Sequence, residues 1–237
     1  MDLHLPKTCD GCTHQFTLQH ALGCKKGGLV IFRHNEIRDE LGYLASLAFT
    51  PSKVQDEPLI NTSPAPAFFG EHEDNLQDRR DSPTLGTDAD ERGDLLIQGL
   101  WTRTNACMVD VRVTDTDAKS YRTKDPKKVL ATQEREKKKK YLEKCLQQRR
   151  HFTPFVISTD GLLGYEAAYL LKRIAYALSL KWRRPYAHTC GWVKSRISIA
   201  TVRATHRCLR GSRIPAELIS VRRPQWEDGA GLGLTRF

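Results

Sequence analysis

Apolar positions three or four residues apart predict a helix near the start of the chain, and a proline followed by many basic residues predicts another near its middle. From Arg33 onward, the apolar stripe comprises Ile37, Leu41, Leu44 and Ala48. This is the spacing of an amphipathic helix, and Pro51 should end it because proline lacks the amide hydrogen that a helix interior needs. A helix with a basic face is expected over 125–150, since Pro126 stands where the first helical turn favours proline.

The same spacing predicts two further helices in the last third of the chain. The first has the apolar stripe Leu163, Ala167, Leu170, Ile174 and Leu178 and should run to Trp182. Pro185 interrupts the pattern, and a last helix is expected over 188–209, with Gly211 as its stop signal.

Short apolar runs predict strands over 54–60, from Asp94, from Met108 and over 151–158. Strand side chains alternate between faces, so Val109, Val111 and Val113 should face a core while Asp110 and Arg112 share the opposite face. Residues 101–106 have the length and composition of a hairpin turn between the two Asp-bearing strands. The predicted order is helix, strand, insertion, strand, strand, helix, strand, helix, helix, which makes the fold mixed α/β.

Segments without periodicity separate these elements and suggest the domain boundaries. Residues 61–92 are rich in Pro, Ser, Asp, Glu and Asn, so we expect a disordered insertion there. The expected division is a small metal-binding module at 1–30, a core at 31–185, a basic helix at 186–213 and a flexible tail at 214–237.

Charge is distributed unevenly along the 237 residues, whose net charge is +10. Lys and Arg outnumber Asp and Glu by 13 to 4 over 119–150 and by 9 to 0 over 181–213, whereas residues 61–90 carry 2 against 7. Two basic stretches favour a polyanionic partner, DNA or RNA, although basic helices can also be merely solvated or lie on membranes. The residues expected to contact nucleic acid are Lys138, Lys139, Arg196, Arg203, Arg207 and Arg210.

No apolar run approaches the eighteen or so residues that span a bilayer, and the N-terminus lacks the apolar stretch of a secretory signal. Seven cysteines, three of them near one end, suit a metal site in a reducing compartment better than a disulfide framework. We therefore expect a soluble protein of the nucleus or cytoplasm, without a membrane partner.

Four soft ligands near the N-terminus have the spacing of a tetrahedral zinc site. They are Cys9, Cys12, His20 and Cys24. Zinc would supply the folding energy, because a segment this short has little core of its own. His14 or His34 could replace His20.

Asp94 and Asp110 predict a second, catalytic metal site. If the two strands pair, the carboxylates can meet and bind Mg²⁺ or Mn²⁺, which take few protein oxygens plus substrate phosphate. Hydrolysis of a phosphodiester also needs a cation to balance charge on phosphorus, and Arg112, Lys137 and Lys140 compete for that role. The ordinary alternatives are salt-bridged strand-end aspartates and solvated lysines.

Other side chains are weaker candidates for metal binding or for stacking on bases. Further metal ligands could come from Glu36, Asp39, Glu40 or Glu57, although exposed helix carboxylates are usually solvated. The aromatic residues among the basic ones are Trp101, Tyr121, Tyr141, Trp182 and Trp192. These rings could stack on bases or simply pack against the core.

A series of short motifs carries a resemblance to a known family. They are the Cys-Cys-His-Cys set with Gly27-Gly28, then Arg33-His34-Asn35, Asp94-Leu95-Leu96, Val109-Asp110-Val111-Arg112-Val113, Lys137-Lys138-Lys139-Lys140-Tyr141, Phe152-Thr153-Pro154 and Lys181-Trp182. Together they resemble the C-terminal region of LINE-like non-LTR retrotransposon polyproteins over most of residues 9–213. Where such elements carry a restriction-like endonuclease, a zinc knuckle lies just upstream of a PD-(D/E)XK nuclease domain. The predicted order of elements is similar to that superfamily's core of helix, three strands, helix and strand.

The resemblance implies an endonuclease that nicks target DNA, so that the exposed 3′ end primes reverse transcription by a fused or associated reverse transcriptase. It implies that Asp94 and Asp110 are the catalytic aspartates, and that Lys137 or Lys140 with Tyr141 forms the downstream lysine-tyrosine motif. The chain departs from the pattern twice, with Gly93 where proline is expected and Arg112 where lysine is expected.

Arginine is a poor proton donor, which favours the helix lysines over Arg112 for a role in proton transfer. No Tyr-x-Asp-Asp pattern of a polymerase occurs, so reverse transcription is not expected of this chain itself. One alternative is a catalytically silent remnant that binds nucleic acid through the zinc knuckle and basic helices. Another is a protein-interaction role for the last two helices.

Overall fold

The computed structural model describes residues 6–60 and 91–214. The predicted disordered insertion and flexible tail therefore lie almost entirely outside the described residues. The described part is a mixed α/β fold with five α-helices and a four-stranded sheet, as the apolar pattern predicts.

The sheet has the spatial order β1-β2-β3-β4, which is also the order of the strands along the chain. The strands are β1 (Val54–Asp56), β2 (Leu95–Gln98), β3 (Ala106–Thr114) and β4 (His151–Ser158). The first three pair antiparallel, and β2 and β3 form the expected hairpin. β4 pairs parallel with β3 because helix α3 (Pro126–Gln147) carries the chain back between them.

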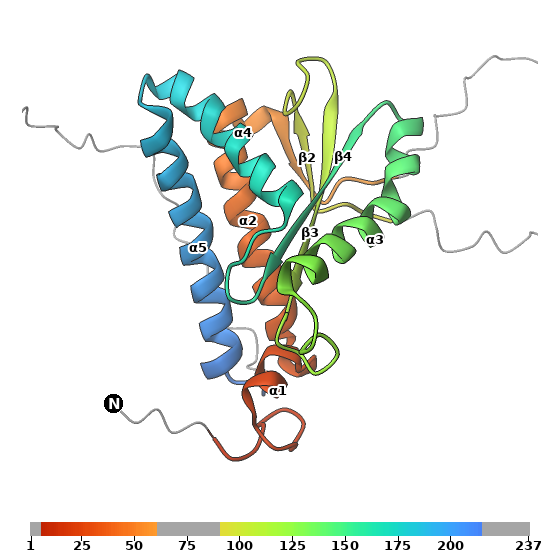
Figure 1. The fold of residues 1–237 in the computed structure, drawn as a ribbon, viewed down its shortest axis with the longest axis vertical. Helices are drawn as coiled ribbons and strands as arrows, with labels where there is room; N and C mark the ends of the chain where they lie inside the picture. The colour runs from red at the N-terminus through yellow and green to blue at the C-terminus, as the bar shows by residue number, and fades with distance from the viewer. Residues whose placement is uncertain (1–5, 61–90, 215–237) are drawn as a thin grey trace, which may run out of the picture.

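Helices cover both faces of the sheet (Figure 1). One face is covered by α2 (Leu29–Phe49) and α4 (Tyr165–Trp182), with α5 (Tyr186–Arg210) packed against both of them, and α3 covers the other face. The short helix α1 (Leu18–Gly23) lies at one end of the molecule beside the end of α5. The order α2, β1, β2, β3, α3, β4 is the predicted succession of helix, three strands, helix and strand.

Alternation along β3 divides its side chains between two cores. Val109 and Val111 are buried in the main core with α2, α4 and α5, and Val113 packs at its edge. Met108 belongs to a smaller cluster beneath α3 that contains Tyr141. The predicted inward face of Val109, Val111 and Val113 is confirmed, and Asp110 is left on the face toward α3.

Several element boundaries differ from those expected. Helix α2 begins at Leu29, four residues before Arg33, because Gly27 and Gly28 both have φ of 70° and turn the chain directly into the helix. Strand β1 ends at Asp56, since Glu57 has φ of 48° and leaves the extended conformation. α3 ends at Gln147 and α5 begins at Tyr186. No helix within residues 6–60 and 91–214 is both long enough and apolar enough to cross a membrane.

Candidate functional site

The four soft ligands near the N-terminus form one compact cluster. One ligand atom from each of Cys9, Cys12, His20 and Cys24 lies within 4.8 Å of all the others, and Cys12 Sγ is 3.2 Å from His20 Nε2. Thr17 accepts a hydrogen bond from the His20 amide and so caps the start of α1. Cys24 follows the end of this helix, four residues after His20, so one helical turn separates the two ligands. The cluster fits a zinc ion.

The environment of Cys9 favours the thiolate that a zinc ion needs. Burial acts to raise the pKa of the Cys9 thiol, but hydrogen bonds from His20 and from nearby backbone outweigh it and lower the pKa to about 6. Of the alternative ligands, the ring of His14 contacts the Cys12 carbonyl, 3.0 Å away. His34 pairs with Asp94 instead. His20 is therefore the histidine of the cluster.

The Cys/His segment packs against the end of α5. Asp10 Oδ2 accepts hydrogen bonds from Ser212 Oγ at 2.7 Å and from the Arg213 amide at 2.8 Å. The guanidinium of Arg213, which is 2% exposed, lies 5.1 Å from the centre of the Phe16 ring and donates to the Ala21 carbonyl. A side chain at position 27 would meet the backbone of Arg213, so this close approach also requires Gly27.

A second contact joins the cluster to the sheet side of α2. Leu22 lies between the ligands His20 and Cys24, and its carbonyl accepts a hydrogen bond from Arg33 at 3.0 Å. Arg33 is only 4% exposed, and its Nε has no hydrogen-bond partner. Zinc binding would thus hold the carbonyl that orients a buried arginine.

Asp94 and Asp110 come together at the start of β2. Leu95 pairs with Val109 in the antiparallel register, so one more step places Asp94 opposite Asp110. Asp94 Oδ1 accepts from His34 Nε2 at 2.8 Å, and Asp94 Oδ2 accepts from the Val111 amide at 2.6 Å. The pairing places both side chains on the same face of the sheet, and the charge of Asp94 acts on the carboxyl of Asp110.

Asp110 is buried beneath α3 and is 6% exposed. Burial raises the pKa of its carboxyl, nearby Lys137 opposes this, and the charge of Asp94 raises the pKa further. Lys137 Nζ lies 2.6 Å from Asp110 Oδ2, but the approach is not aligned as a hydrogen bond, so this buried oxygen has no aligned donor. A metal ion bound at Asp110 Oδ2 would therefore share this oxygen with the ammonium group of Lys137.

The three candidate cations occupy different places. Only Lys137 reaches Asp110. Lys140 Nζ turns away and lies 2.7 Å from Glu91 Oε1 and 2.8 Å from Tyr141 Oη, while the Tyr141 ring is buried. Arg112 donates to Glu136 at 3.2 Å. The geometry therefore separates Lys137 from Lys140, which the sequence left as equal alternatives.

A hollow of about 280 Å³ is lined in part by His34 and Lys137, the residues that pair with the two aspartates. Its charged and titratable lining comes from Arg33 and His34 on α2, Arg112 on β3 and Lys137 on α3. No acidic side chain is among the residues that line it, and the unpartnered Nε of Arg33 is buried. The arrangement suits an anion the size of a phosphate group.

No protein-family model and no curated protein matches this chain. Among residues 6–60 and 91–214, the Cys/His cluster is the only group of three or more His, Cys, Asp or Glu side chains close enough to hold a metal ion. None of Glu36, Asp39, Glu40 and Glu57 joins Asp94 and Asp110 in such a group.

Three of these acids have other partners, and one of those partners is a predicted nucleic-acid contact. Asp39 and Glu57 both pair with Arg38, at 3.0 and 2.6 Å. Both oxygens of Glu40 accept from Arg196, at 2.6 and 3.0 Å, so the charge of Arg196 is matched within the protein. Arg196 is thus less available to a phosphate than the sequence suggests.

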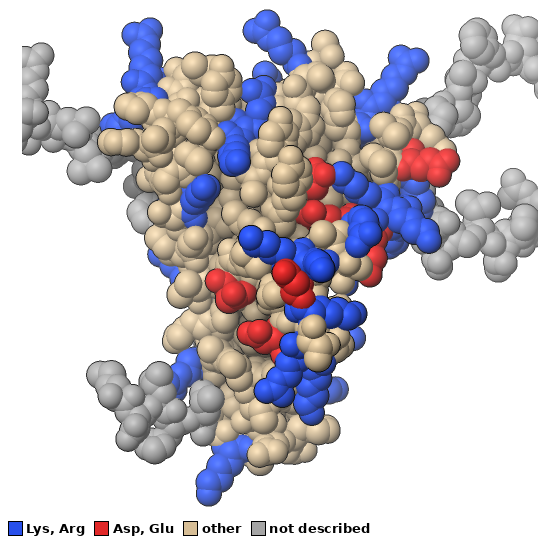
Figure 2. Space-filling model, viewed as in Figure 1, with Lys and Arg blue, Asp and Glu red and all other residues tan. Residues whose placement is uncertain are grey.

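The remaining predicted contacts lie mainly on the surface. Lys139, Arg203 and Arg210 are exposed, Arg207 is exposed with its guanidinium 4.2 Å from the centre of the Phe32 ring, and Lys138 pairs with Glu166. Figure 2 shows Lys and Arg side chains gathered over α3 and the loop before it, with acidic side chains between them. This basic surface borders the hollow beside Asp110.

The candidate aromatic residues differ in burial. Tyr141 is buried, and Trp101 stacks on Tyr169 and donates to Thr153 Oγ1. Trp182 and Trp192 meet edge to face, but both are exposed and line a hollow. Tyr121 lines another hollow.

The sequence analysis missed Arg33 and His34 as members of the aspartate site. A usable signal was present, because both fall on the buried side of α2. Arg33 stands four residues before Ile37, and His34 seven before Leu41. A charged residue on a core-facing stripe needs a partner, and here the partners are the α1 carbonyl and Asp94.

Glu91 gives a test of the ion pairs that fix α3 near β2. Burial acts to raise the pKa of Glu91, but Lys140 and Lys144 lower it below its ordinary value of 4.5. The pairing should therefore stabilise the fold above pH 4.5 and be lost as the pH falls through the lower folded-state pKa. We expect Glu91→Gln to lower the free energy of unfolding by roughly 0.5–1 kcal/mol at neutral pH, and by much less below the folded-state pKa. Urea unfolding on the two sides of this range tests the expectation, and an equal loss at both pH values contradicts it.

Proposed function

We propose that this protein is a metal-dependent endonuclease that hydrolyses DNA phosphodiesters, with a PD-(D/E)XK-like core behind a zinc-binding module. The observation that carries the proposal is that the β2–β3 register sets Asp94 opposite Asp110, and that Lys137 lies against Asp110. Two carboxylates and a cation beside a positively lined hollow are the groups that hydrolysis of a phosphodiester requires.

Asp94 and Asp110 would hold Mg²⁺ or Mn²⁺, and Cys9, Cys12, His20 and Cys24 would hold Zn²⁺. The donor sets fit these ions, since carboxylate oxygens suit hard divalent cations whereas thiolates and imidazole suit zinc. Mg²⁺ or Mn²⁺ would neutralise developing negative charge and make water a better nucleophile at neutral pH.

The chain's own side chains would position the substrate. Arg33 and Arg112 line the hollow from two sides and can hold the oxygens of one phosphate. His34 fixes the orientation of Asp94 through a 2.8 Å contact. Lys137 would balance negative charge on the phosphate as the bond to phosphorus breaks.

The resemblance to non-LTR retrotransposon polyproteins supports a more specific role within this proposal. The nick would supply a 3′ end that primes reverse transcription, performed by a reverse transcriptase domain fused to this chain or acting with it. Such a role requires nucleic acid as partner, and the exposed basic surface over α3 agrees with that requirement.

Nicking of supercoiled plasmid tests the proposal. We expect relaxed plasmid to accumulate with the zinc-loaded protein when Mg²⁺ or Mn²⁺ is added, and not when both ions are omitted. Omission is preferable to chelation, because a chelator would also strip the Cys/His cluster. Nicking without either ion, or its absence under all conditions while the protein remains folded, would overturn the proposal.

A change at Lys137 tests the assignment of the cation. We expect Lys137→Met to slow nicking by about 100-fold, the usual effect of removing one group that stabilises charge in the transition state. Lys140→Met is the matched control, since Lys140 is on the same helix but faces Glu91. The measurement is the single-turnover rate. Equal rates for Lys137→Met and wild type would remove Lys137 from the site.

A silent nucleic-acid-binding protein is the second candidate, and one observation favours it. Both oxygens of Asp94 are already hydrogen-bonded, to His34 and to the Val111 amide, and Asp110 is already paired with Lys137. Such a site is stable without a second metal. Binding that weakens steeply with salt, without metal-dependent nicking, would support this candidate.

A further inference from the structure

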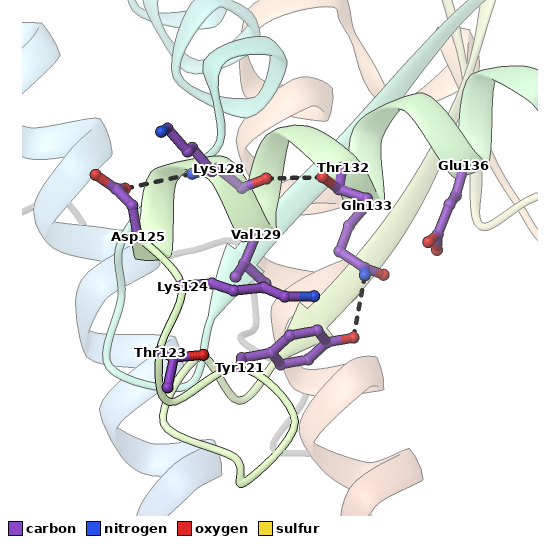
Figure 3. A pocket seen from close by; sticks show the side chains of 9 residues that line it. All are labelled: Tyr121, Thr123, Lys124, Asp125, Lys128, Val129, Thr132, Gln133 and Glu136. Carbon is purple, nitrogen blue, oxygen red and sulfur yellow. Dashed lines mark hydrogen bonds between the residues drawn. The ribbon is translucent and has the colours of Figure 1, made fainter.

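A larger hollow lies beside the proposed catalytic site, between the loop 115–125 and the first turns of α3. Its volume is about 420 Å³, which exceeds that of a nucleobase. Figure 3 shows the ring of Tyr121, the amide of Gln133 and the ammonium group of Lys124 turned toward the same space. The side chain of Val129, which is 2% exposed, adds an apolar surface.

Gln133 brings an unsatisfied polar atom to this hollow. The residue is 2% exposed, and its Nε2 donates to Tyr121 Oη at 3.3 Å. Its Oε1 has no hydrogen-bond partner. Exchanging the amide oxygen and nitrogen would leave the other atom unpaired, so the hollow offers one free amide group in either orientation.

The lining of the hollow carries two lysines and two acidic residues. Lys124 Nζ lies 5.7 Å from the centre of the Tyr121 ring, and Lys128 is exposed at the rim. Both acidic residues of the lining are engaged elsewhere. Asp125 caps α3 by accepting from the amides of residues 127 and 128, and Glu136 accepts from Arg112.

The ion pair of Arg112 and Glu136 links this hollow to the anion site. Glu136 lines the larger hollow, whereas Arg112 lines the one beside Asp110. A strand whose phosphate occupies the smaller hollow can therefore continue along α3 into the larger one. The next nucleotide would then meet an aromatic face, a free amide and two lysines.

We infer that the hollow lined by Tyr121 and Gln133 binds the base of an unpaired nucleotide adjacent to the cleaved bond. This inference rests on the proposed function for the path of the strand. Tyr121 stacks on the base, Gln133 forms a hydrogen bond with its edge, and Lys124 moves off the ring to contact the backbone phosphate. Paired bases in a duplex hide their faces, so the substrate class is a strand with a bulged, flapped or flipped-out nucleotide.

Fluorescence of 2-aminopurine tests the inference by binding alone, without cleavage. The zinc-loaded full chain is titrated, without Mg²⁺ or Mn²⁺, into a short duplex that carries one bulged 2-aminopurine, and in parallel into the fully paired duplex. We expect quenching of the bulged probe by wild type and by Tyr121→Phe. Tyr121→Ala should bind the bulged probe roughly tenfold more weakly, with unchanged affinity for the paired duplex.

Tyr176→Ala is the matched control, because Tyr176 is also a tyrosine with a cation near its ring but lies on α4. Binding of the bulged probe by wild type without quenching would overturn the inference, and so would equal affinities for wild type and Tyr121→Ala. Tyr121-dependent quenching in a protein that never nicks plasmid would uphold the base site while rejecting the endonuclease. Plasmid nicking that is unaffected by Tyr121→Ala, together with no quenching of the bulged probe, would uphold the endonuclease while rejecting the base site.

Discussion

Asp110→Asn is expected to reduce metal-dependent nicking of plasmid by at least about 1,000-fold. The substitution preserves shape but removes the carboxylate whose Oδ2 lacks an aligned hydrogen-bond donor. A bound metal ion contributes several kcal/mol to a phosphoryl transition state, and each 1.4 kcal/mol or so is worth a factor of ten in rate. The single-turnover rate at saturating Mg²⁺ is the measurement.

Stability separates this catalytic loss from unfolding. Burial already penalises the charge of Asp110, as the raised pKa of its carboxyl shows, so Asn should leave the thermal midpoint close to that of wild type. Asp117→Asn is the matched control, since Asp117 is exposed in the loop after β3. Wild-type nicking by a folded Asp110→Asn protein would eliminate the assigned site.

Cys24→Ser is expected to abolish stoichiometric zinc binding and to lower the thermal midpoint by roughly 10 °C or more. The Cys/His segment has only a small buried cluster around Phe16 and Ala21, so the metal must supply much of its folding energy. A loss of several kcal/mol corresponds to a shift of this size in a domain of this length. Zinc content by mass spectrometry and thermal unfolding by circular dichroism are the measurements.

The loss of stability caused by Cys24→Ser should extend beyond the Cys/His cluster. Asp10 holds the amide of Arg213, and the Leu22 carbonyl holds Arg33 in the anion hollow. Hydrogen exchange is therefore expected to increase at the last turn of α5 and around Arg33. Cys190→Ser is the control, because Cys190 lies outside the cluster on α5. An unchanged zinc content and midpoint for Cys24→Ser would show that the cluster is not a zinc site.

The fold follows largely from local patterns in the sequence. Apolar stripes at helical spacing mark α2, α4 and α5, Pro126 marks the start of α3, and alternation marks the inward face of β3. Boundaries were less accurate where the deciding factor was a single backbone angle. The positive φ of Gly28 starts α2 early, and that of Glu57 ends β1.

The candidate sites, like the fold, could be predicted where they depend on residues close together in the chain. The spacing of Cys9, Cys12, His20 and Cys24 was sufficient to predict their cluster, because all four lie within sixteen residues and a short turn brings them together. The pairing of Asp94 with Asp110 depended only on a hairpin. Short-range features of this kind are readable because few chain conformations can satisfy them.

By itself, the sequence determined the mixed α/β class, the Cys/His ligand set and the face of β3 on which Asp110 lies. Only the tertiary structure decided that Lys137 and not Lys140 reaches Asp110, that Glu40 engages Arg196, and that Arg33 and His34 belong to the aspartate site. These contacts join residues far apart in the chain. They depend on how helices sit on the sheet, which is set by the packing of the whole core and not by the pattern within any one segment.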